Sequence, residues 1–384
     1  MNAPTTPTRR LLAASILLAA AGDAAATNAV VSPPNCNEAG FAAALAAVDG
    51  SGSGTITFNC GTATITFTNY KTIANDVVID GGNAITFDGG NTSALFQVFA
   101  SANATLKGLT LQHAEFNQSH ALENFGALKL DHVRVQTNVS AGPVVANSGT
   151  LRVRWSTFSG NQNTATAIGG DGGVIANDGG DASVESSTFT GNSTGRYGGA
   201  IYSNSTLDVL DSTFTGNATT GMGSGGGAIY QAGSGTSTVE YATIVGNTGQ
   251  AFGGGLYNDG AGSATLVVSR SIMANNTNGN CDGVLTSGGY NVWFGATSCP
   301  FAAPGDGAGD PMLGALANNG GPTQTMLPGA GSAAINRVPN AQCAQPYDQR
   351  GASRPGGVIG NGSCDSGAVE VSGTLDLIFY DGFE

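Results

Sequence analysis

The sequence predicts an all-β fold, a parallel β-helix in which short strands coil repeatedly around one interior. The phrase Ser-Thr-Phe-Ser-Gly-Asn at 156–161 returns as Ser-Thr-Phe-Thr-Gly-Asn at 187–192 and at 212–217. Looser copies follow, so that a large apolar residue recurs at intervals of 31, 25, 30 and 28 residues, at Phe158, Phe189, Phe214, Ile244 and Ile272. Self-similarity at such a period indicates stacked repeats, each of which buries its apolar face only against its neighbours.

The spacing inside one repeat predicts three short strands. Leu207 and Val209 are two residues apart and share one face of a strand. Phe214 lies five residues further on, so the chain must bend before it for both to face inward. Ile201 belongs to another short run that glycines set off. We expect three corners in each coil, with Gly and Asn in left-handed backbone, and about nine coils in all.

The two ends of the stack are expected to differ. Residues 37–48 carry apolar side chains at helical spacing after Asn37, a suitable N-cap, and predict a helix that covers the first coil. Such a cap protects the exposed strand edge. Residues 55–58 and 64–67 alternate as strands do. From about residue 300, isolated Gly and Pro predict an irregular segment that closes the stack.

Composition and the amino terminus predict an exported protein. Arg9 and Arg10 precede an apolar run, and Ala24-Ala25-Ala26 offers a cleavage site, as in a signal peptide. No later run is long enough for a transmembrane helix. The net charge of −13 argues against a nucleic-acid partner. Nothing indicates self-association, so we expect a monomer.

Six cysteines agree with an oxidising compartment. They allow 15 pairings, and pairing within each local unit is favoured. The expected disulfides are Cys36–Cys60, Cys281–Cys299 and Cys343–Cys364. Zinc binding is the rival interpretation, but no Cys-x-x-Cys occurs and the three histidines lie far from the cysteines in sequence.

The C-terminal motifs support a resemblance. They are Asp310-Pro311-Met312-Leu313-Gly314, Asn318-Asn319-Gly320-Gly321-Pro322-Thr323-Gln324-Thr325, Asp348-Gln349-Arg350-Gly351 with Arg354-Pro355, and Cys364-Asp365-Ser366-Gly367-Ala368-Val369-Glu370. This region resembles bacterial choice-of-anchor (Q-type) surface proteins, and the repeats resemble those of polymorphic outer-membrane proteins. The resemblance implies a right-handed β-helix of the pectate-lyase-like class, secreted or held at the surface of a Gram-negative bacterium. The usual Cys-Ser-Leu-Arg-Glu box is absent beyond Cys36.

No catalytic residue and no cofactor are expected from the sequence. Pectate lyases use an Arg or Lys base with carboxylate-held calcium, and no matching set stands out. The weak calcium candidates are Asp171, Asp178 and Asp181, with Asp306 and Asp310 as a similar pair, although Asp-Gly corners of the repeat are the favoured explanation for both groups. Arg152 and Arg154 share a strand face, which favours a solvated surface.

Histidines and tyrosines complete the candidates. His113 and His120 are seven residues apart, and His132 follows; surface positions are favoured for all three. Tyr202, Tyr230 and Tyr257 recur at coil spacing and predict an aromatic ladder, either a sugar-binding surface or packing between coils.

The sequence therefore favours a non-catalytic exported surface protein that adheres to or contacts a polysaccharide or another cell-surface ligand. A polysaccharide lyase or glycoside hydrolase on the same scaffold is the alternative. The expected organisation is a signal peptide at 1–26, a cap and β-helix at 27–300, a choice-of-anchor-like segment at 301–370, and a tail at 371–384 that is a sorting signal or a last strand.

Overall fold

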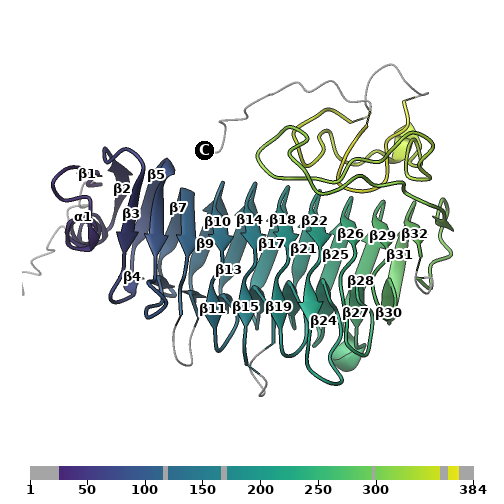
Figure 1. Ribbon diagram of the computed structural model, residues 1–384, viewed down its shortest axis with the longest axis horizontal. Coiled ribbons are helices and arrows are strands. Elements are labelled where there is room, and N and C mark those ends of the chain that lie inside the picture. Colours follow the sequence, from purple (N-terminus) through teal and green to yellow (C-terminus); the bar gives the residue numbers. More distant parts are fainter. Residues whose placement is uncertain (1–25, 116–119, 166–170, 296–298, 355–361, 372–384) are drawn as a thin grey trace, which may run out of the picture.

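The structure, a computed structural model, describes residues 26–115, 120–165, 171–295, 299–354 and 362–371. The chain forms a parallel β-solenoid of about ten coils, with one helix near its amino terminus (Figure 1). All but the last residue of the predicted signal peptide, and all but the first residue of the predicted tail, lie outside the described residues. Each coil visits the same sheets in the same order, as the repeats predict.

The first strand of each coil belongs to a nine-stranded parallel sheet. Its strands are β4 (Lys71–Ile73), β6 (Phe96–Val98), β8 (Leu122–Asn124), β12 (Val145–Asn147), β16 (Ile175–Asn177), β20 (Ile201–Ser203), β24 (Ile229–Gln231), β27 (Leu256–Asn258) and β30 (Cys281–Gly283).

The next two strands of each coil belong to one long sheet of 20 strands, bent along its length. We call the two sides of the bend its upstream and downstream branches. The first coils and the upstream branch comprise β1 (Ala29–Val31), β2 (Ser53–Phe58), β3 (Ala63–Thr66), β5 (Asp76–Asp88), β7 (Asn103–Gln112), β9 (Ala127–Asp131), β13 (Thr150–Arg154), β17 (Asp181–Glu185), β21 (Leu207–Leu210), β25 (Thr236–Glu240), β28 (Thr265–Ser269) and β31 (Leu285–Gly289). The downstream branch comprises β10 (Arg134–Gln136), β14 (Thr157–Ser159), β18 (Thr188–Thr190), β22 (Thr213–Thr215), β26 (Thr243–Val245), β29 (Ile272–Ala274), β32 (Val292–Phe294) and β33 (Gly307–Ala308).

A fourth strand, which the sequence analysis missed, is present in the central coils. It forms a small sheet of β11 (Val139–Ser140), β15 (Gln162–Asn163), β19 (Ser193–Thr194) and β23 (Ala218–Thr219). Each of these strands has only two residues, which is too short to show an alternation of apolar and polar side chains.

Stacked phenylalanines fill the interior behind the downstream branch. Phe158, Phe189 and Phe214 are fully buried. Their ring centroids are 4.5 and 4.8 Å apart, with the ring planes 6° and 7° from parallel. The predicted interior stack is confirmed for these residues and continues at Ile244, which pairs with Phe214.

The expected place of Ile272 in this stack is wrong. Met273, fully buried, pairs with Ile244, whereas Ile272 pairs with Thr243 and faces outward. The fifth copy of the repeat has no glycine: Asn275 takes the left-handed backbone there, with φ of 54°. Ile272 is nevertheless buried, because the C-terminal segment covers it together with Val292.

Asparagines line the interior beside the phenylalanines. The left-handed corners predicted for Gly and Asn are found, with φ of 64° at Gly191 and 54° at Asn275, and the asparagine that follows such a corner in the repeat is buried. Each asparagine amide donates to the amide oxygen of the next, over 2.8–3.0 Å, and to a backbone carbonyl. This asparagine ladder comprises Asn138, Asn161, Asn192, Asn217, Asn247, Asn276 and Asn280. Because every buried amide of the ladder is hydrogen-bonded, the ladder helps to specify one packing arrangement of an otherwise apolar core.

The predicted helix caps the first coil as α1 (Glu38–Gly50). Asn37 is its N-cap, and its side chain accepts a hydrogen bond from the Gly40 amide over 3.0 Å. Phe41 is fully buried, with its ring 4.7 Å from that of Phe87. The helix therefore covers the open apolar end of the stack.

Glu38 joins this helix to the following turn and predicts a pH dependence of folding. Burial alone raises the pKa of Glu38, but hydrogen bonds from Lys71 (2.5 Å) and Thr68 (2.8 Å) outweigh it and lower the pKa to about 2. A lowered pKa means that this stabilisation is complete above the unfolded-state value near 4.5 and is lost as the pH falls towards 2. Melting temperatures across this range should fall less for Glu38→Gln than for the parent. Exposed Glu115→Gln is the control; if both variants follow the parent, this role of Glu38 is wrong.

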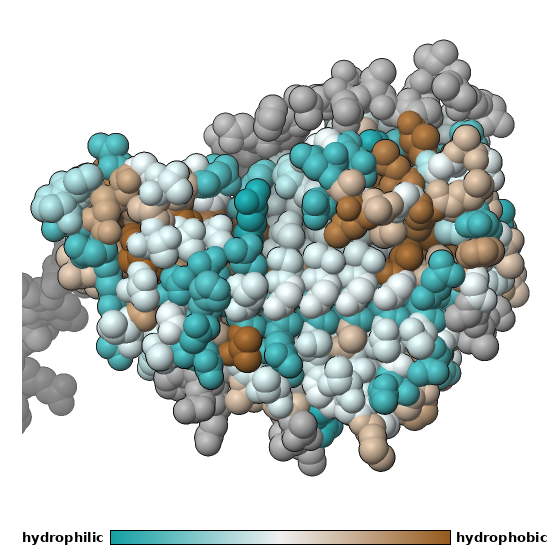
Figure 2. Space-filling view, viewed as in Figure 1, coloured by the Kyte–Doolittle hydropathy of each residue, from teal (hydrophilic) through white to brown (hydrophobic). Residues whose placement is uncertain are grey.

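The C-terminal segment, residues 299–354 and 362–371, is irregular as predicted, but it does more than close the stack. It folds back along the outer face of the downstream branch, beside β22, β26, β29 and β32 (Figure 1). Gln349 donates to Thr188 and Thr323 over 2.9 Å each and accepts from Thr213 over 2.6 Å. Hydrophobic residues gather where this segment meets the coils (Figure 2).

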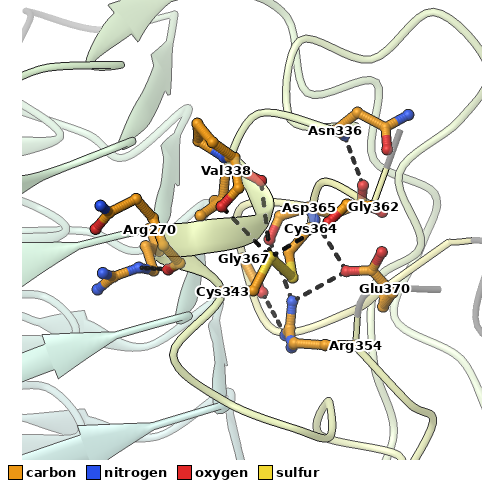
Figure 3. The surroundings of a disulfide bond; sticks show 12 residues. Arg270, Asn336, Val338, Cys343, Arg354, Gly362, Cys364, Asp365, Gly367 and Glu370 are labelled. Atoms are coloured by element: carbon orange, nitrogen blue, oxygen red, sulfur yellow. Dashed lines mark hydrogen bonds and ion pairs between the residues drawn. A yellow bond between two sulfur atoms is a disulfide. The ribbon is translucent and has the colours of Figure 1, made fainter. Parts of the chain in front are cut away.

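The three disulfides are the local pairs expected from the sequence, Cys36–Cys60, Cys281–Cys299 and Cys343–Cys364. The last lies in the C-terminal segment beside a buried ionic network (Figure 3). At its centre the fully buried Arg354 donates to Asp211 of the solenoid over 2.9 Å and to Glu370 over 3.4 Å. Burial lowers the pKa of Arg354, but the negative charges of Asp211, Asp348 and Glu370 outweigh the effect of burial and raise the pKa. The guanidinium therefore stays charged.

Candidate functional site: the tyrosine row

The predicted tyrosine ladder lies on the outer face of the nine-stranded sheet. Tyr202 pairs with Tyr230, and Tyr230 with Tyr257, at the middle positions of β20, β24 and β27. The residues on either side, such as Ile201 and Ser203, point into the interior and are buried. The alternation of a β-strand thus directs one tyrosine outward from each of three successive coils.

Two loop residues extend this ladder. Tyr197 lies 4.5 Å from Tyr230, and Phe252 lies 5.3 Å from Tyr257, between ring centroids. Tyr202–Tyr230 and Tyr230–Tyr257 are 5.7 and 4.9 Å apart. We call Tyr197, Tyr202, Tyr230, Phe252 and Tyr257 the tyrosine row. The repeat pattern did not predict the two loop members, although each directly precedes two or more glycines that lead into a strand.

Glycine allows the turn before β24 to pass close to Tyr230. Gly226 has φ of 67°, and a Cβ built on it would lie 2.7 Å from the Cβ of Tyr230. Only a residue without a side chain fits at that distance. Tyr230 is therefore held in the centre of the row, while Tyr202, Tyr257 and Phe252 keep part of their surface in solvent.

Carboxylates surround the row. Burial, together with Asp171, Asp178 and Asp259, raises the pKa of Tyr202 to about 12. Burial and Asp259, which accepts from the Tyr230 hydroxyl over 3.3 Å, also raise the pKa of Tyr230. The hydroxyls thus stay protonated and remain hydrogen-bond donors. Aromatic surface, hydroxyl donors and carboxylate acceptors together suit a ligand with apolar faces and many hydroxyl groups.

Arg196 lies at the edge of the row. Its Nε donates to Asp171 over 2.8 Å, and its guanidinium carbon lies 5.1 Å from the Tyr197 ring centroid. An arginine and several carboxylates therefore share this face, but the arginine is committed to an ion pair. The arrangement suits recognition of polar groups better than proton abstraction.

The calcium candidates do not converge. Asp171 binds Arg196, Asp178 accepts from the Asn204 amide, and Asp181 belongs to β17 with its side chain in solvent. Asp306 accepts from Ser287 and from the Asn291 and Ala303 amides, and Asp310 from the Met312 amide. Within the described ranges, no group of three or more His, Cys, Asp or Glu residues is placed to hold a metal ion.

The histidines lie at separate places in the coils. His113 bonds to Asp88 over 2.9 Å and His132 to Asp131 over 2.7 Å, whereas His120 bonds to the Pro143 carbonyl over 2.9 Å. All three are partly exposed, and their different partners do not assemble a catalytic set.

Comparison with protein-family models, with curated proteins and with solved structures found no match to this chain. The described residues contain no helix of the length and apolar character needed to cross a membrane.

Proposed function

We propose that this chain is an exported surface protein of a Gram-negative bacterium that binds a polysaccharide without cleaving it. The observation that carries the proposal is the tyrosine row, with its partly exposed rings and its border of carboxylates. Aromatic rings offer apolar contact area to the faces of sugar rings, and the hydroxyls and carboxylates bond to sugar hydroxyls. The excess of carboxylates favours neutral sugars.

Surface attachment is the second part of the proposal. The choice-of-anchor resemblance supports it, and the motif residues Asp348, Arg350, Arg354 and Glu370 lie in the buried network that holds the C-terminal segment to the coils. We infer that these motifs stabilise a junction between the solenoid and the anchoring part of the chain.

The alternative is a polysaccharide lyase or glycoside hydrolase on the same scaffold, which rests on fold analogy alone. It predicts new reducing ends in a panel of polysaccharides, with turnover that needs calcium and that Asp171→Ala abolishes. Such a result would overturn the non-catalytic proposal.

Combined replacement of Tyr202 and Tyr257 by alanine should weaken polysaccharide binding by roughly tenfold, because two partly exposed rings are lost. Binding to a panel of neutral polysaccharides, measured by affinity electrophoresis, tests this. Tyr70→Ala, which removes an exposed tyrosine near the amino-terminal cap, is the matched control. Equal binding by the parent, the double variant and the control would show that the row only packs between coils.

A further inference from the structure

A second surface of opposite charge lies on the long sheet, where the chain bends between its branches. We call Lys129, His132, Arg134, Arg152, Arg154 and Trp155 the basic patch. Lys129 pairs with Arg152 on adjacent strands β9 and β13, so the backbones that carry the two cations are about 4.8 Å apart along the stack. Figure 2 shows hydrophilic residues gathered over β7, β9 and β13.

The patch is basic in an acidic protein. Four of the chain's 13 lysines and arginines lie in two successive coils. Asp131 bonds to Lys129 (3.4 Å), and Glu185 bonds to Arg154 (3.3 Å). Arg134 and Arg152 are exposed, and neither forms an ion pair with any other described residue. The patch therefore keeps two uncompensated positive charges.

An aromatic platform lies among these charges. The Arg154 guanidinium carbon is 3.8 Å from the Trp155 ring centroid, and the His132 ring is 4.9 Å from that of Trp155. His132 and Trp155 occupy the corner in left-handed backbone, with φ of 55° and 46°. Bulky residues rarely adopt this conformation, which here directs both rings out of the sheet.

The same corner binds polypeptide in the later coils. Asp211, Tyr241, Arg270 and Tyr290 also have positive φ at this corner. Asp211 and Tyr241 contact Arg354, Arg270 donates to the Gln342 carbonyl, and Tyr290 accepts from Ser366. His132 and Trp155 belong to coils before those that the C-terminal segment covers. The corner is thus an interaction surface along the stack, and its early part carries basic groups.

We propose that the basic patch binds an acidic polysaccharide, with Arg134 and Arg152 bonding to its sulfate or carboxylate groups and Trp155 contacting a sugar ring. Charge-assisted bonds from arginine suit planar and tetrahedral anions. The net charge of −13 for the whole chain repels every polyanion at a distance, so binding has to rely on this locally basic surface. Nucleic acid is the alternative polyanion, and the test includes it. The proposal does not depend on the tyrosine row.

The test compares dextran sulfate with unmodified dextran, which differ only in their anionic groups. The full chain should bind dextran sulfate, with affinity falling as salt is added. Substitutions in the basic patch should not change its binding to unmodified dextran. Combined Arg134→Gln and Arg152→Gln should weaken binding roughly tenfold, whereas Arg152→Lys should retain most of it.

The single variant Arg152→Gln is compared with Arg337→Gln, which removes one positive charge outside the patch. Arg337→Gln should have little effect on the binding of dextran sulfate. The tyrosine double variant should bind dextran sulfate as the parent does. Equal losses for Arg152→Gln and Arg337→Gln would overturn the proposal. Tighter binding of an oligo-dT of matched charge would also overturn it, in favour of single-stranded nucleic acid.

Discussion

Replacing Arg354 by methionine is expected to lower the free energy of unfolding of the C-terminal segment by about 3–5 kcal/mol, because it leaves buried carboxylates without their cation. Arg354 is fully buried and bonds to Asp211 and Glu370, and to the carbonyls of Gly367 (2.9 Å) and Asp365 (3.1 Å). Methionine keeps much of the side-chain volume, so the loss measures charge and hydrogen bonding rather than a cavity.

Limited proteolysis under increasing urea, with cleavage followed in the C-terminal segment, measures this loss. Arg337→Met is the matched control, because Arg337 is partly exposed and bonds to one carbonyl. The solenoid itself should keep its strands in both variants. If Arg354→Met resists proteolysis as well as Arg337→Met does, the network adds no stability to the docked segment.

Phe189→Ala is expected to destabilise the central coils by about 3–5 kcal/mol, the usual cost of emptying a buried phenylalanine site. The cavity would lie between the rings of Phe158 and Phe214, which are held apart by strand spacing and cannot close on it.

Urea unfolding followed by circular dichroism measures this effect. Thr190→Ala, one residue along the same strand and on the outer face, should cost less than about 1 kcal/mol. A similar loss for both variants would mean that the phenylalanine stack does not dominate the stability of these coils.

The repeats predicted much of the fold because the interval between equivalent strands of successive coils appears in the sequence as the interval between similar residues. The period placed Phe158, Phe189 and Phe214 in one stack, and strand alternation placed the three tyrosines on one face. Cysteines paired locally because each pair spans only 18–24 residues.

Where the repeat lost its glycine, the prediction failed by one residue. The copy at 271–276 has Asn275 in place of glycine, and Ile272 was aligned with the phenylalanines although Met273 occupies their position. An apolar residue on the outer face of a sheet, such as Ile272, is expected only where another segment buries it. That cover comes from Met326 and Ala334, more than 50 residues away, which no local pattern shows.

The candidate surfaces were predicted only in part for the same reason. Tyr202, Tyr230 and Tyr257 share a strand position, whereas Tyr197 and Phe252 reach the row from loops. Arg152 and Arg154 were expected to form a solvated face. Their relation to Arg134 depends on how sharply the sheet bends at Trp155, which is a property of the folded backbone.

The asparagine ladder has a consequence for how such a chain can change in length. Successive members between Asn161 and Asn276 are separated by 25 to 31 residues, yet their amides stay within 3.0 Å of one another. Loops between strands can therefore gain or lose residues freely. One residue added between Phe189 and Asn192 would turn the Asn192 side chain away from the interior. Several buried hydrogen-bond donors and acceptors would then lose their partners at once. A coil can therefore vary in length, but the same residues of its strands must face the interior. The unit that can be duplicated or removed is a whole coil, from one ladder asparagine to the next.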